Sequence, residues 1–480
     1  ENASRRKWMA LVVVCLGQLM MVVDMTIVNV ALPVVQRDLD FSQANLTWVV
    51  NAYLISYGSF MLLAGRVGDL VGRKRVFLSG LLLFTAASVA CGLADDQLVL
   101  IAARFVQGLG GAIATSVIIA LIVTDFPRPD ERVKAMSAYM FVVTSGGSLG
   151  LLLGGVIVQS VDWHWIFFVN VPIGAVVLAL GARLLEERRG SGLRGGLDIA
   201  GSLLVTVAMM VAVYAVVTAA EHGWASAHTL GFGAVAVLLL AAFFALEARV
   251  AHPILPLRLL RSRTLVGASA VRGFLVVGMF GSWVLGSLYL EHVLGYGAWS
   301  TGLAFLPMTL TVGLLSLGAT ARVMARLGPP RTVLLGLTLV VASLLWLAQA
   351  GVGASYLTDL FVPYTLMGLG MGTAMLPLLT IAMSGVPADD AGIASGFVNV
   401  TMQLAGAFGI AVLGTLASDR TEALADAGAS AAGALTGGYH LAFEIAAIAV
   451  AVGIVLALAV LRPPRRERME PAGSELAVEV

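Results

Sequence analysis

The stretch GRVGDLVGRKRVFLSG, residues 65–80, has a second copy in the same chain, ARVMARLGPPRTVLLG, residues 321–336. The two copies align without gaps at an offset of 256 residues, with identities that include Arg66/Arg322, Gly72/Gly328 and Gly80/Gly336. Each copy lies between two long apolar segments. A loop motif that recurs at corresponding places in two hydrophobic halves predicts a membrane protein built by internal duplication.

The composition agrees with a protein that crosses the membrane many times. Of the 480 residues, 59% are hydrophobic and 12% are charged, whereas a soluble domain carries about 25% charged residues. Many segments are long enough to cross about 30 Å of hydrocarbon. Cys15 and Cys91 lie inside such segments, so neither a disulfide framework nor a metal site is predicted. No small-residue cleavage site follows the first apolar segment, so we expect that segment to remain as the first span.

The apolar runs between polar breaks predict fourteen transmembrane helices. They cover residues 8–34, 45–66, 75–94, 98–124, 134–160, 164–186, 197–219, 229–247, 264–292, 299–324, 330–350, 356–384, 391–417 and 438–461. Of the 29 Lys and Arg residues, all but Arg37, Arg420, Arg104 and Arg272 fall at the termini or in alternate loops. The positive-inside rule therefore predicts that both termini are cytoplasmic, which requires an even number of spans.

The repeated motif fixes how these helices are grouped. Its two copies are eight spans apart, whereas a plain duplication of six helices would separate them by six. We therefore predict an all-α, 6 + 2 + 6 arrangement around a central cavity, with 197–219 and 229–247 as an extra, lipid-facing pair. The predicted parts are a six-helix bundle (1–190), a two-helix insert (191–255), a second six-helix bundle (256–462) and a cytoplasmic tail (463–480).

The first predicted helix contains one negative charge, Asp24, in the run MMVVDMTIVNVALP, residues 20–33. An aspartate deep in a membrane helix costs about 2.5–3.5 kcal/mol on insertion scales, and such residues are functional by default. Burial disfavours the charged form of a carboxyl group, so Asp24 is the predicted proton carrier. The alternative is a structural carboxylate locked to an arginine of the fourth helix.

Several motifs resemble the major facilitator superfamily. The loop motif G-x-L-A-D-R-x-G-R-R/K of that family is matched by Gly65, Gly68, Asp69, Gly72, Arg73 and Lys74. DMTIVNVALP and WHWIFFVNVPIG (163–174) resemble signatures of the 14-helix drug:proton antiporter branch, and RFVQGLGGA (104–112) resembles the helix-4 motif. The resemblance covers essentially the whole chain and implies a major facilitator fold. It also implies that Arg104 takes part in proton handling or cavity electrostatics, whereas the alternative is a packing role.

The chain departs from the family pattern in two places. The helix-5 antiporter motif G-P-x-x-G-G reads GLLLGG here, with Leu151 in place of proline. Gly150, Gly154 and Gly155 still allow close helix approach, but no proline-induced bend is expected. The second-half loop motif carries Ala325 where its acid is expected, so only the first-half motif can make contacts through an acidic side chain, Asp69.

Further residues suit a cavity for amphiphilic compounds. Methionine and polar stripes predict a flexible, mixed surface made by Met21, Gln107, Met371, Met375, Asn399 and Gln403. The methionine stripe also fits simple core packing. Glu291 and Glu444 are possible second protonation sites, although solvated acids at helix ends are the favoured interpretation. Arg272 either answers an anionic group of the substrate or, as the favoured alternative, extends toward the aqueous phase.

A contact between the two halves is predicted at the cytoplasmic side. The loop SGVPADDAG lacks Lys and Arg, and it places Asp389 and Asp390 near the start of the thirteenth helix. We expect Arg73 or Lys74 to pair with one of these acids, and Asp69 to face the amides at that helix N-terminus. These contacts would hold the cytoplasmic side closed.

The predicted function is proton-driven efflux of amphiphilic or cationic compounds by alternating access. The alternatives are export of a lipid or an endogenous natural product, or a facilitator without antiport. An enzyme is not expected, because the six histidines form no catalytic or metal-binding cluster. We expect no cofactor, with the proton gradient as the energy source, and no nucleic-acid partner. The expected partners are a small amphiphilic substrate, protons and membrane lipids. We expect the protein to be a monomer in a bacterial inner membrane.

Overall fold

A computed structural model describes residues 2–461, apart from 42, 47, 188, 189, 191–198, 251, 252, 254, 388 and 389. The described residues form helices joined by short turns. The first half contains α1 (Asn2–Asp38), α2 (Gln43–Leu46), α3 (Trp48–Val71), α4 (Arg73–Gly92), α5 (Gln97–Ser116), α6 (Ile118–Asp125), α7 (Pro129–Ser160), α8 (Trp165–Phe168) and α9 (Asn170–Leu184).

Two helices follow, and then a second half that resembles the first. The pair consists of α10 (Ile199–His222) and α11 (Ala227–Glu247). The second half contains α12 (Leu257–Leu260), α13 (Arg263–Phe280), the π-helical turn η2 (Gly281–Leu285), α14 (Gly286–His292), α15 (Ala298–Ala304), α16 (Leu306–Leu314), the π-helical turn η3 (Leu315–Ala319), α17 (Thr320–Leu327), α18 (Pro329–Leu347), the π-helical turn η4 (Tyr356–Leu360), α19 (Phe361–Met383), α20 (Ala391–Asp426) and α21 (Ala431–Val460).

The all-helical class is confirmed, and helical residues occupy each of the fourteen predicted ranges. Among the described residues, 11 helices are long and apolar enough to cross a membrane, or 12 if the two parts of the bent α7 form one span. The segment 298–327 is not among them because its helix is interrupted at Gly318, whose φ is 113°. One pair of boundaries was wrong: α20 continues to Asp426 and α21 begins at Ala431, so helix replaces the predicted polar loop.

The internal duplication is visible in the backbone. Gly72 and Gly328 occupy corresponding places directly before α4 and α18, and their φ angles are 120° and 80°. This region of φ favours glycine because other residues would place Cβ against the backbone. In the following helices a Cβ on Gly80 would lie 2.8 Å from the Gly110 carbonyl oxygen, and a Cβ on Gly336 would lie 2.6 Å from the Gly370 carbonyl oxygen. The two halves therefore share both a turn and a close helix contact.

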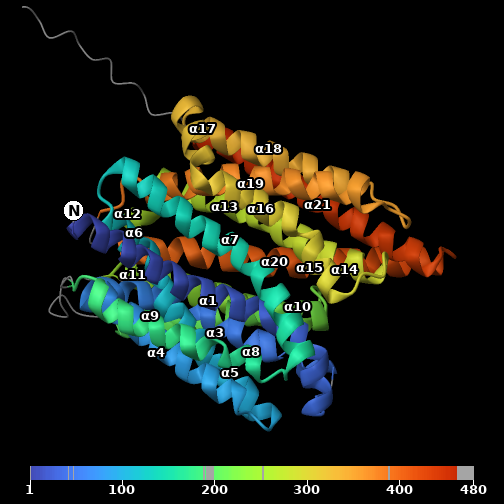
Figure 1. Cartoon of the computed structure of the whole chain (residues 1–480), viewed down its shortest axis with the longest axis horizontal. Coiled ribbons are helices and arrows are strands. Elements are labelled where there is room, and N and C mark those ends of the chain that lie inside the picture. Colours follow the sequence, from blue (N-terminus) through green and yellow to red (C-terminus); the bar gives the residue numbers. More distant parts are fainter. Residues whose placement is uncertain are drawn as a thin grey trace, which may run out of the picture.

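The two halves pack side by side. Figure 1 shows the first-half helices in blue to teal on one side and the second-half helices in yellow to red on the other. They meet where α3 packs against α20 and where α7 packs against α15 and α16. The extra helix α10 packs on both α3 and α20, whereas the apolar stretch of α11 is mostly exposed. The α10 helix thus lies at the boundary of the halves and α11 lies outside it.

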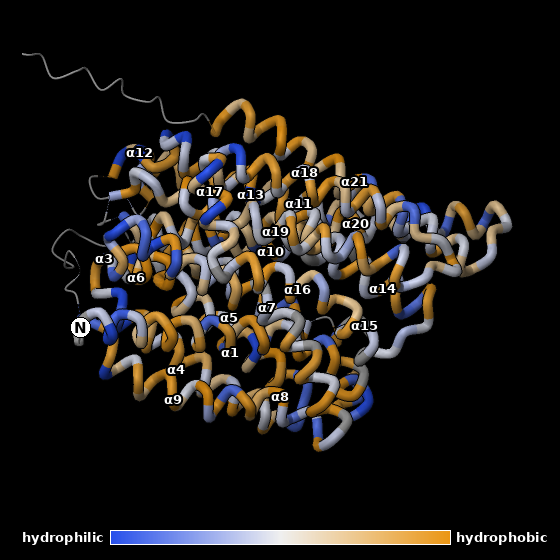
Figure 2. The backbone as a smooth tube through the Cα atoms, turned by 45° about the horizontal axis from the view of Figure 1, so that its top comes forward, coloured by the Kyte–Doolittle hydropathy of each residue, from blue (hydrophilic) through white to orange (hydrophobic). Residues whose placement is uncertain are grey.

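Hydrophobic residues follow the lengths of the helices, and hydrophilic residues gather toward the ends of the bundle (Figure 2). One end carries the N-terminus together with α6, α12 and α17 (Figure 1). We call it the basic end, because it carries Arg5, Arg73, Arg128, Arg258 and Arg326.

The α7 helix bends by 41° between its parts Pro129–Gly147 and Leu152–Val158. The bend occurs without the proline of the family motif, whose absence the sequence analysis noted. Gly147 and Ser148 lie next to each other at the bend, and such Gly/Ser pairs are common sites of helix kinks.

Candidate functional site

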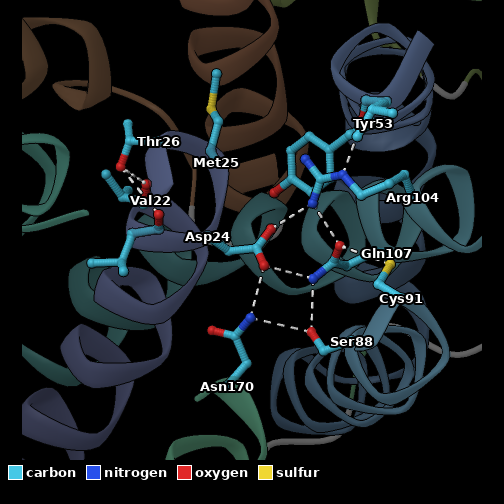
Figure 3. A network of polar contacts seen from close by, with 12 residues as sticks. Val22, Asp24, Met25, Thr26, Tyr53, Ser88, Cys91, Arg104, Gln107 and Asn170 are labelled. Atoms are coloured by element: carbon cyan, nitrogen blue, oxygen red, sulfur yellow. Dashed lines mark hydrogen bonds and ion pairs between the residues drawn. The ribbon is translucent and has the colours of Figure 1, made fainter. Parts of the chain in front are cut away.

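Asp24 lies in the middle of α1 and is fully buried in the first half. Its Oδ2 accepts a hydrogen bond from Arg104 Nη1 at 2.7 Å, and its Oδ1 accepts from Gln107 Nε2 at 2.8 Å and from Asn170 Nδ2 at 2.7 Å. Figure 3 shows these three donors converging on the carboxylate from α5 and α9. An ionised carboxylate accepts only, so the arrangement fits the charged form of Asp24.

Arg104 is held from several sides. Besides Asp24, it donates from Nη1 to Gln107 Oε1 at 2.6 Å and from Nε to the Val49 carbonyl oxygen at 3.1 Å. Its guanidinium carbon lies 4.4 Å from the centre of the Tyr53 ring, which adds a cation–π contact. The side chain is 1% exposed. The sequence interpretation of Asp24 locked to a helix-4 arginine therefore describes the geometry of this conformation.

Ser88 on α4 completes the network. Its hydroxyl accepts from Gln107 Nε2 at 2.7 Å and from Asn170 Nδ2 at 3.3 Å, so the two amides that hold Asp24 are themselves held together (Figure 3). Gln107 was predicted to line a substrate cavity; in this conformation it is fully buried, and its amide donates to Asp24 and Ser88. Ser88 and Asn170 were not predicted, although Asn170 is the polar residue inside the quoted FVNVPIG motif.

The network is suited to respond to a proton. In the ionised state three donors face one carboxylate, and the buried ion pair compensates two charges that would each be expensive alone. Protonation of Asp24 would remove its charge and turn one oxygen into a donor facing other donors. Arg104 would then lack its counter-ion, so the helices α1, α5 and α9 would have to rearrange around it.

The helix-5 motif places α7 directly on α1. A Cβ on Gly150 would lie 2.8 Å from the Val23 carbonyl oxygen, and one on Gly154 would lie 3.1 Å from the Ile27 carbonyl oxygen. A Cβ on Gly155 would meet no described atom within 4 Å. Two of the three motif glycines thus allow the approach of α7 to the helix that carries Asp24.

Asp69 joins the two halves at the basic end. Its carboxylate accepts from the backbone N–H groups of Gly392 and Ile393, at 3.0 Å each, at the start of α20. A Cβ on Gly65, one turn earlier, would lie 2.6 Å from the Gly392 carbonyl oxygen. The expected placement of Asp69 against this helix N-terminus is therefore found. The basic end is closed at this point in this conformation.

The expected partners of Arg73 and Lys74 need correction. Arg73 binds Asp69 itself, through Nη2 at 2.8 Å and Nε at 3.1 Å, because the two residues are four apart. Lys74 donates to the carbonyl oxygens at the end of α9. Asp390 pairs with Arg258 of its own half at 2.6 Å rather than with either of them. Asp389 lies outside the described residues.

A cavity of about 10 Å³ lies between α7 of the first half and α16, η3, α17 and α19 of the second, which is about the room that one water needs. Met371 and Met375, two of the residues predicted for the substrate cavity, line it. Met21 is buried against Thr115, whose hydroxyl donates to its sulfur at 3.2 Å.

The remaining candidate residues separate clearly. Glu291 and Glu444 are exposed, in agreement with the favoured interpretation of solvated acids. Gln403 is half-buried, and Asn399 is buried with its Nδ2 unpartnered. Arg272 is 2% exposed, so the favoured expectation that it extends toward the aqueous phase was wrong. Among the described residues no group of three or more His, Cys, Asp or Glu side chains is placed to bind a metal ion.

These features define a class of protein: a duplicated helical membrane bundle with a buried ion pair and a polar contact that closes one end. Residues 14–410 match the family model of the Major Facilitator Superfamily, and the chain belongs to this superfamily.

The known proteins that it resembles agree with the family. The chain is 39% identical to the puromycin resistance protein pur8 of Streptomyces alboniger, over 96% of this chain and 92% of that protein. It is 35% identical to the cephamycin export protein CmcT of Amycolatopsis lactamdurans, over 97% and 94% of the two chains. The solved structure of the human organic anion transporter MFSD10 (TETRAN) shares the fold, with a TM-score of 0.66, 16% identity and coverage of 94% and 99%.

Proposed function

We propose that this protein exports small amphiphilic compounds in exchange for protons. The relatives support export, since one carries the name of an antibiotic resistance protein and another that of an antibiotic export protein. The observation that carries proton coupling is the Asp24 network. It is a buried carboxylate whose three donors depend on its charge.

In the proposed cycle Asp24 binds the coupling proton. A proton that arrives from the outer side neutralises the carboxylate and releases Arg104 from its counter-ion. The freed guanidinium and the rearranged amides of Gln107 and Asn170 favour a different packing of α1, α5 and α9. Release of the proton on the cytoplasmic side restores the ion pair, so each conformation has its own preferred protonation state.

The contact of Asp69 with α20 is the proposed latch of this cycle. The present conformation has the latch closed, and the cavity between α7 and α19 measures about 10 Å³, which is too small for a drug-sized compound. Opening at the basic end would separate α3 from α20 and admit substrate between the halves. Closing the latch again would commit that substrate to the opposite side.

The proposed topology has fourteen spans in a 6 + 2 + 6 order, with the basic end in the cytoplasm of a bacterial cell. Two helical ranges beyond the apolar spans support this number. They are α10, with its shorter apolar part Ala200–Val216, and the interrupted segment α15–α17. The basic residues at one end support the orientation. The proposed parts remain 1–190, 191–255, 256–462 and 463–480, in a monomer surrounded by lipid.

A second candidate is export of an endogenous natural product by the same route. The name of the cephamycin export protein favours it, because that relative covers nearly the whole chain. A lipid exporter or a facilitator without proton exchange has no feature of its own in the described residues that favours it.

Substrate-induced proton movement in proteoliposomes tests the proposal. A panel of lipophilic cations and neutral drugs is compared for the wild type, Asp24→Asn and Asp38→Asn. Asp38 lies on the same helix and accepts from Trp163 Nε1 at 2.8 Å, so its replacement makes the same chemical change away from the network. Asp24→Asn should lose proton movement and uphill transport while downhill exchange of substrate persists. Full coupled transport by Asp24→Asn would rule out the proposed role.

A further inference from the structure

The second half contains a buried arginine without a counter-ion. Arg272 lies nine residues into α13, about 14 Å along the helix at 1.5 Å per residue. Its side chain is 2% exposed, and its Nη2 contacts the Met402 sulfur at 3.4 Å. The Nε and Nη1 atoms have no hydrogen-bond partner among the described residues. The guanidinium therefore retains free N–H groups deep in the bundle.

The other arginine buried to the same degree shows what is missing. Arg104 satisfies its guanidinium with a carboxylate, an amide and a carbonyl group. Arg272 has a thioether instead, which is a weak acceptor. A buried cation that lacks a partner is strongly unfavourable for the fold. Its cost is offset when an anion binds, so the arrangement points to a ligand rather than to structural packing.

The surroundings of Arg272 add further unsatisfied polar groups. Ser269 lies one turn earlier on α13, and its buried hydroxyl is unpartnered among the described residues. Asn399 lies one turn before Met402 on α20, and its Nδ2 donor is likewise unpartnered at 1% exposure. These groups come from two helices that pack directly on each other. Donors outnumber acceptors here, as an anion requires.

The cluster also lies close to the first half. The charge of Arg272 interacts electrostatically with the buried Tyr139 of α7. The neighbours of Tyr139 along α7, Ser137 and Met140, line the small cavity between the halves. Arg272 thus lies near the midplane of the bundle beside the surface where the halves separate, which is where transporters of this architecture bind substrate.

We propose that Arg272, with Asn399 and Ser269, recognises the carboxylate of an amphiphilic organic acid. The inference rests on the proposed export function and specifies a class of substrate for it. A planar guanidinium fork matches a carboxylate with two parallel hydrogen bonds. The weak contact with Met402 leaves the fork available, and the amide of Asn399 supplies a further donor. The site is buried in the present closed conformation and would become accessible to the ligand when the halves separate.

Binding of a matched pair of probes tests this assignment. The probes are 11-(dansylamino)undecanoic acid and its methyl ester, titrated by fluorescence into the purified full-length protein in lipid nanodiscs. The wild type should bind the acid at least about tenfold more tightly than the ester. Arg272→Gln should weaken binding of the acid by about ten- to hundredfold and leave the ester unchanged. Arg331→Gln, at an exposed arginine of α18, is the matched control and should behave as wild type.

Two melting experiments, read together with the titrations, keep the outcomes distinct. Arg272→Met should melt at the same or a higher temperature than the wild type without ligand, since it removes an unpaired charge. A clear fall in melting temperature together with loss of both probes would instead show a structural role and overturn the proposal. Equal affinity of the wild type for acid and ester would also overturn it. A site that binds only an inorganic anion would overturn it as well. In that case chloride would raise the melting temperature of the wild type but not of Arg272→Gln, and the wild type would not prefer the acid to the ester.

The failure of this inference is separable from that of the export function. In proteoliposomes Arg272→Gln should still exchange neutral drugs for protons while losing transport of the acid. If the variant transports both as the wild type does, the carboxylate site is wrong and export stands. If the wild type exchanges no compound for protons, the proposed function fails, and the binding preference measured in nanodiscs still decides the role of Arg272.

Discussion

Replacement of Asp69 by asparagine should open the basic end of the protein. The Asp69 carboxylate accepts two backbone N–H groups from α20 and two N–H groups from Arg73, and its side chain is 2% exposed. Asparagine has the same shape but presents an NH₂ group in place of one oxygen. In either orientation of the amide, a buried donor then faces another donor. At least one bond across the halves is lost or strained.

The size of the effect follows from the bonds that change. A hydrogen bond to a charged group contributes about 1.5–3 kcal/mol. The bonds to Gly392 and Ile393 cross from one half to the other, so in the proposed cycle they are made when the basic end is closed. Loss of one of them should therefore shift the balance between closed and open conformations by about ten- to hundredfold. The bond between Asp69 and Arg73 lies within one half and contributes to both conformations.

Distance measurements between spin labels give the two populations directly. Cys15 and Cys91 are first replaced by serine, and labels are attached at positions 75 and 326, which are exposed at the basic end in opposite halves. Asp69→Asn should increase the fraction of the longer distance. Asp390→Asn is the matched control, because the Asp390 carboxylate pairs with Arg258 within the second half. An unchanged distance distribution in folded Asp69→Asn, or an equal change in Asp390→Asn, would refute the latch.

Two further predictions concern the first half. Gly150→Ala should destabilise the protein by about 1–3 kcal/mol, because the added Cβ would press on α1 at the Val23 carbonyl oxygen. Gly155→Ala is the matched control and should not destabilise the protein, because no described atom lies within 4 Å of its Cβ position. Equal melting temperatures for the two variants would contradict this packing. Asn170→Leu removes a donor that favours the ionised form of Asp24. Coupled transport should then fall while downhill exchange of substrate persists, and unchanged coupling in a folded variant would show that Asn170 does not act on the proton site.

The fold was largely predictable because its signals are periodic or repeated. Apolar runs of fixed length mark helices whatever their partners are. Gly72 and Gly328 coincide in the two copies of the repeat, and both adopt the positive φ that glycine favours. The bend in α7 was not predicted, because the motif lacks the proline that would have indicated it and glycine or serine positions mark bends less consistently.

The site was predictable only in part, for geometric reasons. Asp24 was identified from its charge in an apolar run, but its partners Gln107 and Asn170 are 83 and 146 residues away. No sequence pattern gives the direction in which such side chains point after folding. The pairing of Arg73 with Asp69 was readable, however, because the two residues are four apart across the start of α4. That local contact competes successfully with the longer-range partners first expected.

The duplication also explains why the two halves hold different chemistry. The segment RFVQGLG (104–110) corresponds to YTLMGLG (364–370), so the place of Arg104 is taken by Tyr364. A Cβ on Gly286 would lie 2.7 Å from the Tyr364 hydroxyl oxygen, so this tyrosine packs against a glycine, whereas Arg104 pairs with Asp24. A neutral pair thus replaces the ion pair while the shared glycines keep the packing.

The second half instead carries its buried charge at Arg272, which has no carboxylate partner among the described residues. The proton site proposed at Asp24 and the anion site proposed at Arg272 lie in different halves, so they can influence each other only through contacts that both halves make. The bonds from Asp69 to the start of α20 are contacts of that kind, because α20 also carries Asn399 beside Arg272. The latch is therefore positioned to make substrate binding in the second half depend on which end of the molecule is open.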